Sequence, residues 1–87
     1  MNIYVSNLGG RVTSESLRAV FATYGQVLST ILVRDELTGL SKGIAFIEMG
    51  KKSEAVVAME RLNGSILDGR AIEVVKTQPG HTSRELA

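Results

Sequence analysis

The fold is decided by residues 42–49, which have the sequence Lys42-Gly43-Ile44-Ala45-Phe46-Ile47-Glu48-Met49. Apolar, β-branched and aromatic residues follow turn residues here, which is typical of a β-strand. Because alternate side chains of a strand point to opposite faces, the stretch has two different faces. One face carries Lys42, Ile44, Phe46 and Glu48, and the other carries Gly43, Ala45, Ile47 and Met49.

Residues 2–7 form a second predicted strand, in which Tyr4 and Ser6 share one face. If the two strands are neighbours, Tyr4 and Phe46 stand side by side on an open face, with Lys42 beside them. Two exposed aromatic rings next to a cation form a platform on which unpaired bases stack. The structural alternative is ordinary sheet packing. We favour the functional interpretation because exposed paired aromatics beside a lysine have little structural use.

Two helices and two more strands complete the prediction. Thr13 is the expected N-cap of a helix that carries Leu17, Val20, Phe21 and Tyr24 at helical spacing, and Gly25 is expected just past its end. The other expected elements are a strand at 27–34, a hairpin loop at 35–41 with Gly39 in its turn, a second helix capped by Ser53 and ended by residues 63–64, a turn at 68–69, and a strand at 71–77.

The resulting order, β-α-β-β-α-β, predicts an α+β fold of the ferredoxin-like, split βαβ type. Right-handed crossovers place both helices on one face of a four-stranded antiparallel sheet and leave the other face open. The expected inward set is Ile3, Val5, Thr30, Leu32, Ala45, Ile47, Met49, Ile72 and Val74. The expected outward set is Tyr4, Ser6, Ile31, Val33, Ile44, Phe46, Glu48, Glu73 and Val75.

Length and composition narrow the functional classes. The chain has 87 residues, a net charge of +1 and no cysteine, which indicates one small domain without disulfides or thiolate metal sites. With so little net charge, binding to nucleic acid must draw on stacking as well as on phosphate contacts. No catalytic constellation is present, and His81 has no metal-ligating partner, so we expect no enzyme activity, metal or cofactor.

A strand follows Met1 directly, and no apolar run approaches the length of a membrane span, so we expect no signal peptide, no membrane contact and a cytoplasmic protein. The predicted domain covers residues 1–79. Residues 80–87 are expected to form a short flexible C-terminal tail.

At this point the chain resembles the RNA recognition motif family. The family's hexamer signature is matched by residues 3–8, and its octamer signature is matched at Lys42, Gly43, Ala45 and Phe46, with Ile47 a close substitute. Beginning at the initiator Met and ending soon after the domain is similar to the short single-domain RNA-binding proteins of bacteria. The resemblance implies binding of single-stranded RNA on the open sheet face.

The resemblance also implies roles for particular residues. Tyr4 and Phe46 would each stack a base, and Lys42 would contact phosphate. Ile44 replaces an aromatic of the family pattern, so it would pack against ribose in place of a ring. Met49 replaces another aromatic, but its parity puts it in the core. Arg34 and Lys76 are expected as further phosphate contacts, and Glu73 is expected to accept a hydrogen bond from a base. Arg70 is expected to be structural. The full set of expected RNA-binding residues is Tyr4, Ser6, Arg34, Lys42, Ile44, Phe46, Glu48, Glu73, Val75 and Lys76.

The open face leaves an alternative. Its expected apolar residues are Ile31, Val33, Ile44 and Val75. They would suit packing under the tail or a loop, or a weak homodimer or other protein partner through the sheet. Single-stranded DNA is a further open partner, because the contacts to the 2′-hydroxyl that distinguish RNA cannot be placed from these residues.

Overall fold

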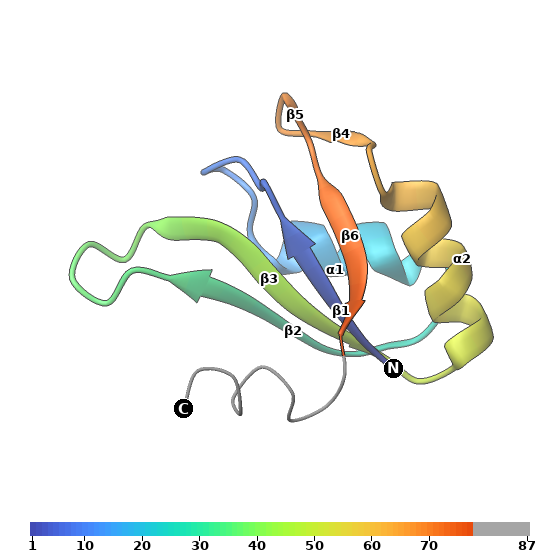
Figure 1. The fold of residues 1–87 in the computed structure, drawn as a ribbon. Helices are drawn as coiled ribbons and strands as arrows, with labels where there is room; N and C mark the ends of the chain where they lie inside the picture. The colour runs from blue at the N-terminus through green and yellow to red at the C-terminus, as the bar shows by residue number, and fades with distance from the viewer. Residues whose placement is uncertain (78–87) are drawn as a thin grey trace.

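A computed structural model describes residues 1–77 of the chain (Figure 1). The elements are β1 (Asn2–Ser6), α1 (Ser14–Ala22), β2 (Val27–Arg34), β3 (Ser41–Met49), α2 (Lys52–Leu62), β4 (Ile66–Leu67), β5 (Arg70–Ala71) and β6 (Glu73–Thr77). The last two residues of the predicted domain, 78–79, and the predicted tail, 80–87 with His81, lie outside the described residues.

The main sheet has the strand order β2-β3-β1-β6, and all of its neighbouring strands are antiparallel. Both helices lie on one side of this sheet, so its other face is left open (Figure 1). The predicted α+β fold is therefore confirmed. Among residues 1–77, no helix is long and apolar enough to cross a membrane.

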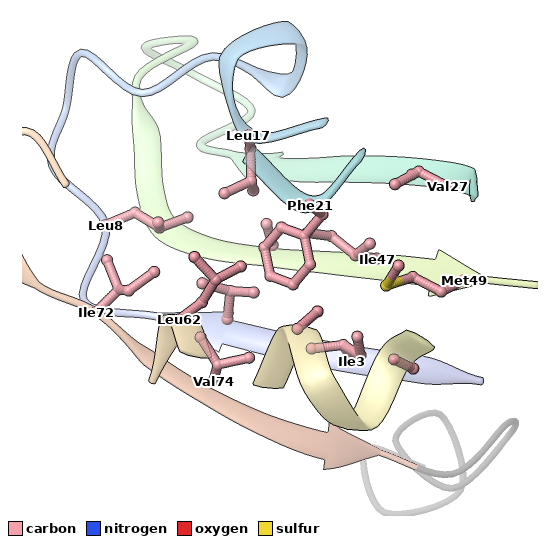
Figure 2. Close-up of a cluster of buried hydrophobic side chains, with 14 of the residues drawn as sticks. Ile3, Leu8, Leu17, Phe21, Val27, Ile47, Met49, Leu62, Ile72 and Val74 are labelled. Carbon is pink, nitrogen blue, oxygen red and sulfur yellow. The ribbon is translucent and has the colours of Figure 1, made fainter. Parts of the chain in front are cut away.

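The core fills the space between the sheet and the two helices (Figure 2). Helix α1 contributes Leu17 and Phe21, and α2 contributes its apolar stripe. Every residue of the predicted inward set is buried except Thr30 and Leu32, which lie on the edge strand β2 and stay partly exposed. Leu8, Val12 and Val27 join the core without having been predicted there.

A β-bulge explains why Val27 is buried. Val27 lies opposite Met49 and Ser29 lies opposite Glu48, so Leu28 is an extra residue in the ladder and is 55% exposed. From Ser29 to Leu32 the pairing is regular. The predicted parity of Ile31, which faces outward opposite Phe46, is therefore confirmed.

The helix starts and ends were predicted with mixed success. Thr13 is the N-cap of α1 and shares a capping box with Ser16, each side-chain oxygen accepting from the other residue's N–H at 3.0 Å. Gly25 was predicted just past the end of this helix, but α1 ends earlier, at Ala22, with Thr23 as its C-cap. The predicted Ser53 cap was also wrong: α2 begins at Lys52, and its N-cap residue makes no side-chain hydrogen bond.

The segment before the last strand contains a small hairpin that was not predicted. Strands β4 and β5 pair around Asp68 and Gly69, whose φ angles are 52° and 76°, as a tight two-residue hairpin turn requires. Ile72 then bonds through its backbone to Ser65 and Gly64 rather than to the main sheet. The last strand therefore starts at Glu73 instead of residue 71.

Asp35 organises the loop between β2 and β3. Its Oδ1 accepts hydrogen bonds from the N–H groups of Thr38 at 3.0 Å and Leu37 at 2.9 Å. These bonds favour the ionised carboxylate and lower the pKa of Asp35, and the bond from the Thr38 N–H has the largest effect. A lowered pKa means that the ionised carboxylate stabilises the folded loop at pH values above the ordinary pKa of aspartate, and that this stabilisation is lost as the pH falls. At neutral pH the stabilisation is therefore fully present.

Candidate functional site

Tyr4 and Phe46 form the centre of the open sheet face. They lie directly opposite each other on β1 and β3, with ring centroids 5.4 Å apart and ring planes tilted by 55°. Both side chains are only partly buried. Since the two rings are tilted, each offers its own surface to a flat ligand rather than forming one plane. The predicted pairing of these rings is confirmed by the register.

Aliphatic residues bound the aromatic pair across the sheet. Val75 lies opposite Tyr4 on β6 and is 49% exposed, and Ile31 lies opposite Phe46 on β2 and is 58% exposed. The row across the four strands is thus an aliphatic residue, two rings and an aliphatic residue. Stacking surfaces are confined to the two middle strands of the sheet.

Two carboxylates flank the rings along the strand direction. Glu48 lies opposite Asn2 and Ser29, and Glu73 lies opposite Ser6. Both glutamates are exposed, and within residues 1–77 neither has a hydrogen-bond or ion-pair partner. An ionised carboxylate only accepts hydrogen bonds, so this part of the face repels phosphate and suits the N–H donors of a ligand.

Lys42 lies at the end of the sheet rather than in line with Phe46. Gly43 has a φ of 78°, and the register between β2 and β3 shifts at this point, so the strict alternation of β3 is interrupted. A Cβ on Gly43 would lie 3.1 Å from the carbonyl oxygen of Leu8, a tight contact that would push on the Leu8 backbone. Lys42 and Ile44 therefore line one hollow at this end of the sheet.

The structure does not bring the other two predicted cations to the rings. Arg34 lies at the end of β2, where its Nη1 donates to the Gly39 carbonyl oxygen at 3.2 Å. Lys76 lies opposite Ile3, a fully buried residue of the helix-covered face, so its parity is opposite to that of Tyr4. Each lies at an edge of the sheet or beyond it, away from the aromatic pair.

The hollow also contains residues that were not predicted as site residues. It has a volume of about 330 Å³ and is lined by Asn7, Leu8, Gly10, Ser41, Lys42, Gly43, Ile44 and Arg70. Asn7 and Arg70 are 63 positions apart in the sequence and meet only through the fold. One signal was available for Asn7, since asparagine tolerates the left-handed backbone that it adopts at φ 60°.

Comparisons with known proteins agree with this geometry. The sequence pattern of the RNA recognition motif matches residues 3–73. Over 79 residues the chain is 47% identical to the "Putative RNA-binding protein RbpB" of Nostoc sp., which covers 91% of this chain and 77% of that protein.

Two solved structures share the fold. The crystal structure of RNA Binding Protein PG1 matches with a TM-score of 0.86 and 39% identity, covering 88% of this chain and 93% of that one. The Sxl-lethal protein/RNA complex matches with a TM-score of 0.83 and 35% identity, covering 87% of this chain and 47% of that one. Both are similar to this chain in sequence as well as in fold.

Proposed function

The chain belongs to the RNA recognition motif family, and on that basis we propose that it binds single-stranded RNA on the open sheet face without catalysing a reaction. The observation that carries the proposal is the exposed pair of Tyr4 and Phe46 at the centre of this face. The names of similar proteins and the RNA complex among similar structures support it. The proposed binding domain is residues 1–79, and its proposed location is the cytoplasm.

Stacking supplies part of the binding free energy. A base stacked on an aromatic side chain contributes about 1–3 kcal/mol, so two rings contribute ~2–6 kcal/mol. A micromolar complex needs about 8 kcal/mol. The remainder comes from polar and phosphate contacts and from the edges of the platform. Because aliphatic residues bound the rings, we propose that the platform takes two stacked bases.

The neighbouring residues complete the proposed site. Ile44 packs against a ribose between the rings and the end of the sheet, where Lys42 meets a phosphate. Val75 contacts the edge of the base on Tyr4, and Ser6 donates or accepts a hydrogen bond beside it. The carboxylates of Glu48 and Glu73, which have no partner among residues 1–77, accept hydrogen bonds from base N–H groups.

The salt dependence of RNA affinity tests the proposal. Each phosphate neutralised on a single strand contributes ~0.7 to the slope of log affinity against log salt concentration. Lys42 contacts one phosphate beside the rings, and Arg34 and Lys76 add up to two more if the RNA extends to the edges of the sheet, so we expect a shallow slope of about −0.7 to −2.1. The measurement is fluorescence anisotropy of a labelled degenerate RNA pool at several salt concentrations. A slope near zero despite tight binding would contradict the role given to the lysine and arginine side chains.

Single-stranded DNA and a second protein would use the same face. DNA offers the same stacking surfaces, so competition between RNA and DNA of identical sequence measures the contribution of the 2′-hydroxyl. A weak homodimer would cover the exposed Ile31 and Val75. Because RNA and a second copy then compete, sedimentation velocity should show any dimer dissociating when RNA is added. A dimer that persists with bound RNA would place self-association on another surface.

A further inference from the structure

Three segments that are far apart in sequence enclose the hollow at the end of the sheet. They are the loop after β1, the start of β3, and the hairpin of β4 and β5, which lie toward the same end of the sheet (Figure 1). The volume of about 330 Å³ lies at the lower end of the ~300–1,000 Å³ typical of small-ligand sites. The hollow is therefore large enough for one nucleotide unit but not for a folded partner.

The floor of the hollow is hydrogen-bonded backbone. The N–H of Leu8 donates to the carbonyl oxygen of Gly43 at 3.0 Å, and the N–H of Gly43 donates to Ser41 Oγ at 3.0 Å. Gly43 has a positive φ, which favours glycine, and as a glycine it places no side chain above this contact. These hydrogen bonds pre-organise the floor for a ligand, which favours binding.

Arg70 is held in the wall of the hollow by a neutral partner. Its Nη2 donates to Asn7 Oδ1 at 2.8 Å, and Asn7 Nδ2 donates in turn to the Ala71 carbonyl oxygen at 2.8 Å. An arginine has five N–H donors, so this bond fixes the guanidinium and leaves donors for a ligand. Because the partner is an amide rather than a carboxylate, the charge of Arg70 is not neutralised.

The charges around the hollow select an anion. Lys42 and Arg70 both line it, and no carboxylate does. The unpartnered carboxylates of the open face, Glu48 and Glu73, lie on the strands outside the lining. Glu73 stands opposite Ser6, next to Asn7, and Asp68 lies two positions before Arg70, but the lining itself holds two positive charges and no carboxylate, which favours a negative group inside the hollow.

We infer that the hollow binds a phosphate of the RNA, held between Lys42 and Arg70, next to the nucleotide that stacks on Phe46. Ile44 lines the hollow and lies two residues from Phe46, about 7 Å along a strand. A strand of RNA leaving the rings reaches the hollow within that distance. Asn7 acts as a positioning residue through Arg70. The inference rests on the proposed function and gives Arg70 a binding role besides its structural one.

Arg70→Gln tests the inference, with Arg61→Gln in the last turn of α2 as the matched control. Glutamine keeps an N–H donor for Asn7 and removes the charge. We expect Arg70→Gln to make the salt slope shallower by ~0.7, the share of one phosphate contact. Over the tenfold change in salt concentration from 1 M to 0.1 M this slope amounts to about a fivefold change in affinity, so the variant should bind RNA about fivefold more weakly at 0.1 M salt. Arg61→Gln should change neither quantity, and Arg70→Lys should keep the slope.

The outcomes separate the two levels of the proposal. If the unchanged protein binds no single-stranded RNA, the proposed function fails and the inference fails with it. If it binds RNA but Arg70→Gln behaves as Arg61→Gln does, only the inference is overturned. Thermal unfolding of each variant establishes folding. If Arg70→Gln does not fold, Arg70→Met, which removes the charge and keeps a long side chain, takes its place, with the same expected loss of slope and the same contradicting result.

Discussion

Replacing Tyr4 and Phe46 together by alanine is expected to cost about 2–6 kcal/mol of RNA binding free energy, because each ring stacks one base at ~1–3 kcal/mol. The fold should be unaffected, since both rings lie on the open face and the core lies on the other side of the sheet. The measurement is the dissociation constant for a short single-stranded RNA, with circular dichroism to verify the fold.

Two controls make this result specific to stacking. Phe46→Tyr keeps a ring and should keep most of the affinity. Ile66→Ala removes a side chain that is 70% exposed on β4, in the hairpin rather than the main sheet, and should leave the affinity unchanged. If the double alanine variant binds RNA as tightly as the unchanged protein, base stacking on the sheet is excluded.

Phe21→Ala is expected to lower the free energy of unfolding by about 3–5 kcal/mol, the usual cost of truncating a buried phenylalanine. Phe21 is fully buried and lies centrally among the core side chains between α1 and the sheet (Figure 2). A chain of this length has a total stability of roughly 4–13 kcal/mol, at ~0.05–0.15 kcal/mol per residue. If the total stability lies near the lower end of this range, the loss would leave a large fraction of the variant unfolded.

Urea denaturation measures this loss of stability. The control is Arg18→Ala, at an exposed position on the same helix, which should change the free energy of unfolding by less than about 0.5 kcal/mol. Phe21→Leu should fall between the two, because leucine refills part of the cavity. If Phe21→Ala had the same urea midpoint as Arg18→Ala, the packing of Phe21 in the core would not contribute to the stability of the fold.

The sequence predicted the open face well because strand alternation has a short, strict period. Alternation fixes which neighbours in each strand share a face with Tyr4, Phe46 or Val75, and the register then places these three residues in one row. The alternation fails only where the backbone departs from the ladder. At Leu28 an extra residue enters the strand, and at Gly43 a positive φ displaces Lys42 toward the end of the sheet.

Other features could not be predicted because they depend on contacts between distant segments. Glycine is the residue type usually found just past a helix end, which is why Gly25 was expected there. In the structure, its lack of a side chain makes room for Glu54, whose carboxylate accepts a hydrogen bond from the N–H of Gln26 at 3.2 Å. The hollow likewise depends on Asn7 meeting Arg70 across 63 positions. Local propensity carries no information on such contacts.

The location of RNA on the protein tests the account most directly. Backbone amide NMR shifts should be recorded for residues 1–77 during titration with a short degenerate single-stranded RNA. The account predicts that the largest shifts cluster at Tyr4, Ile44 and Phe46 and weaken as salt is added, while the amides of α2 stay in place. Shifts on the helices with none at these three residues would contradict RNA binding on the open face.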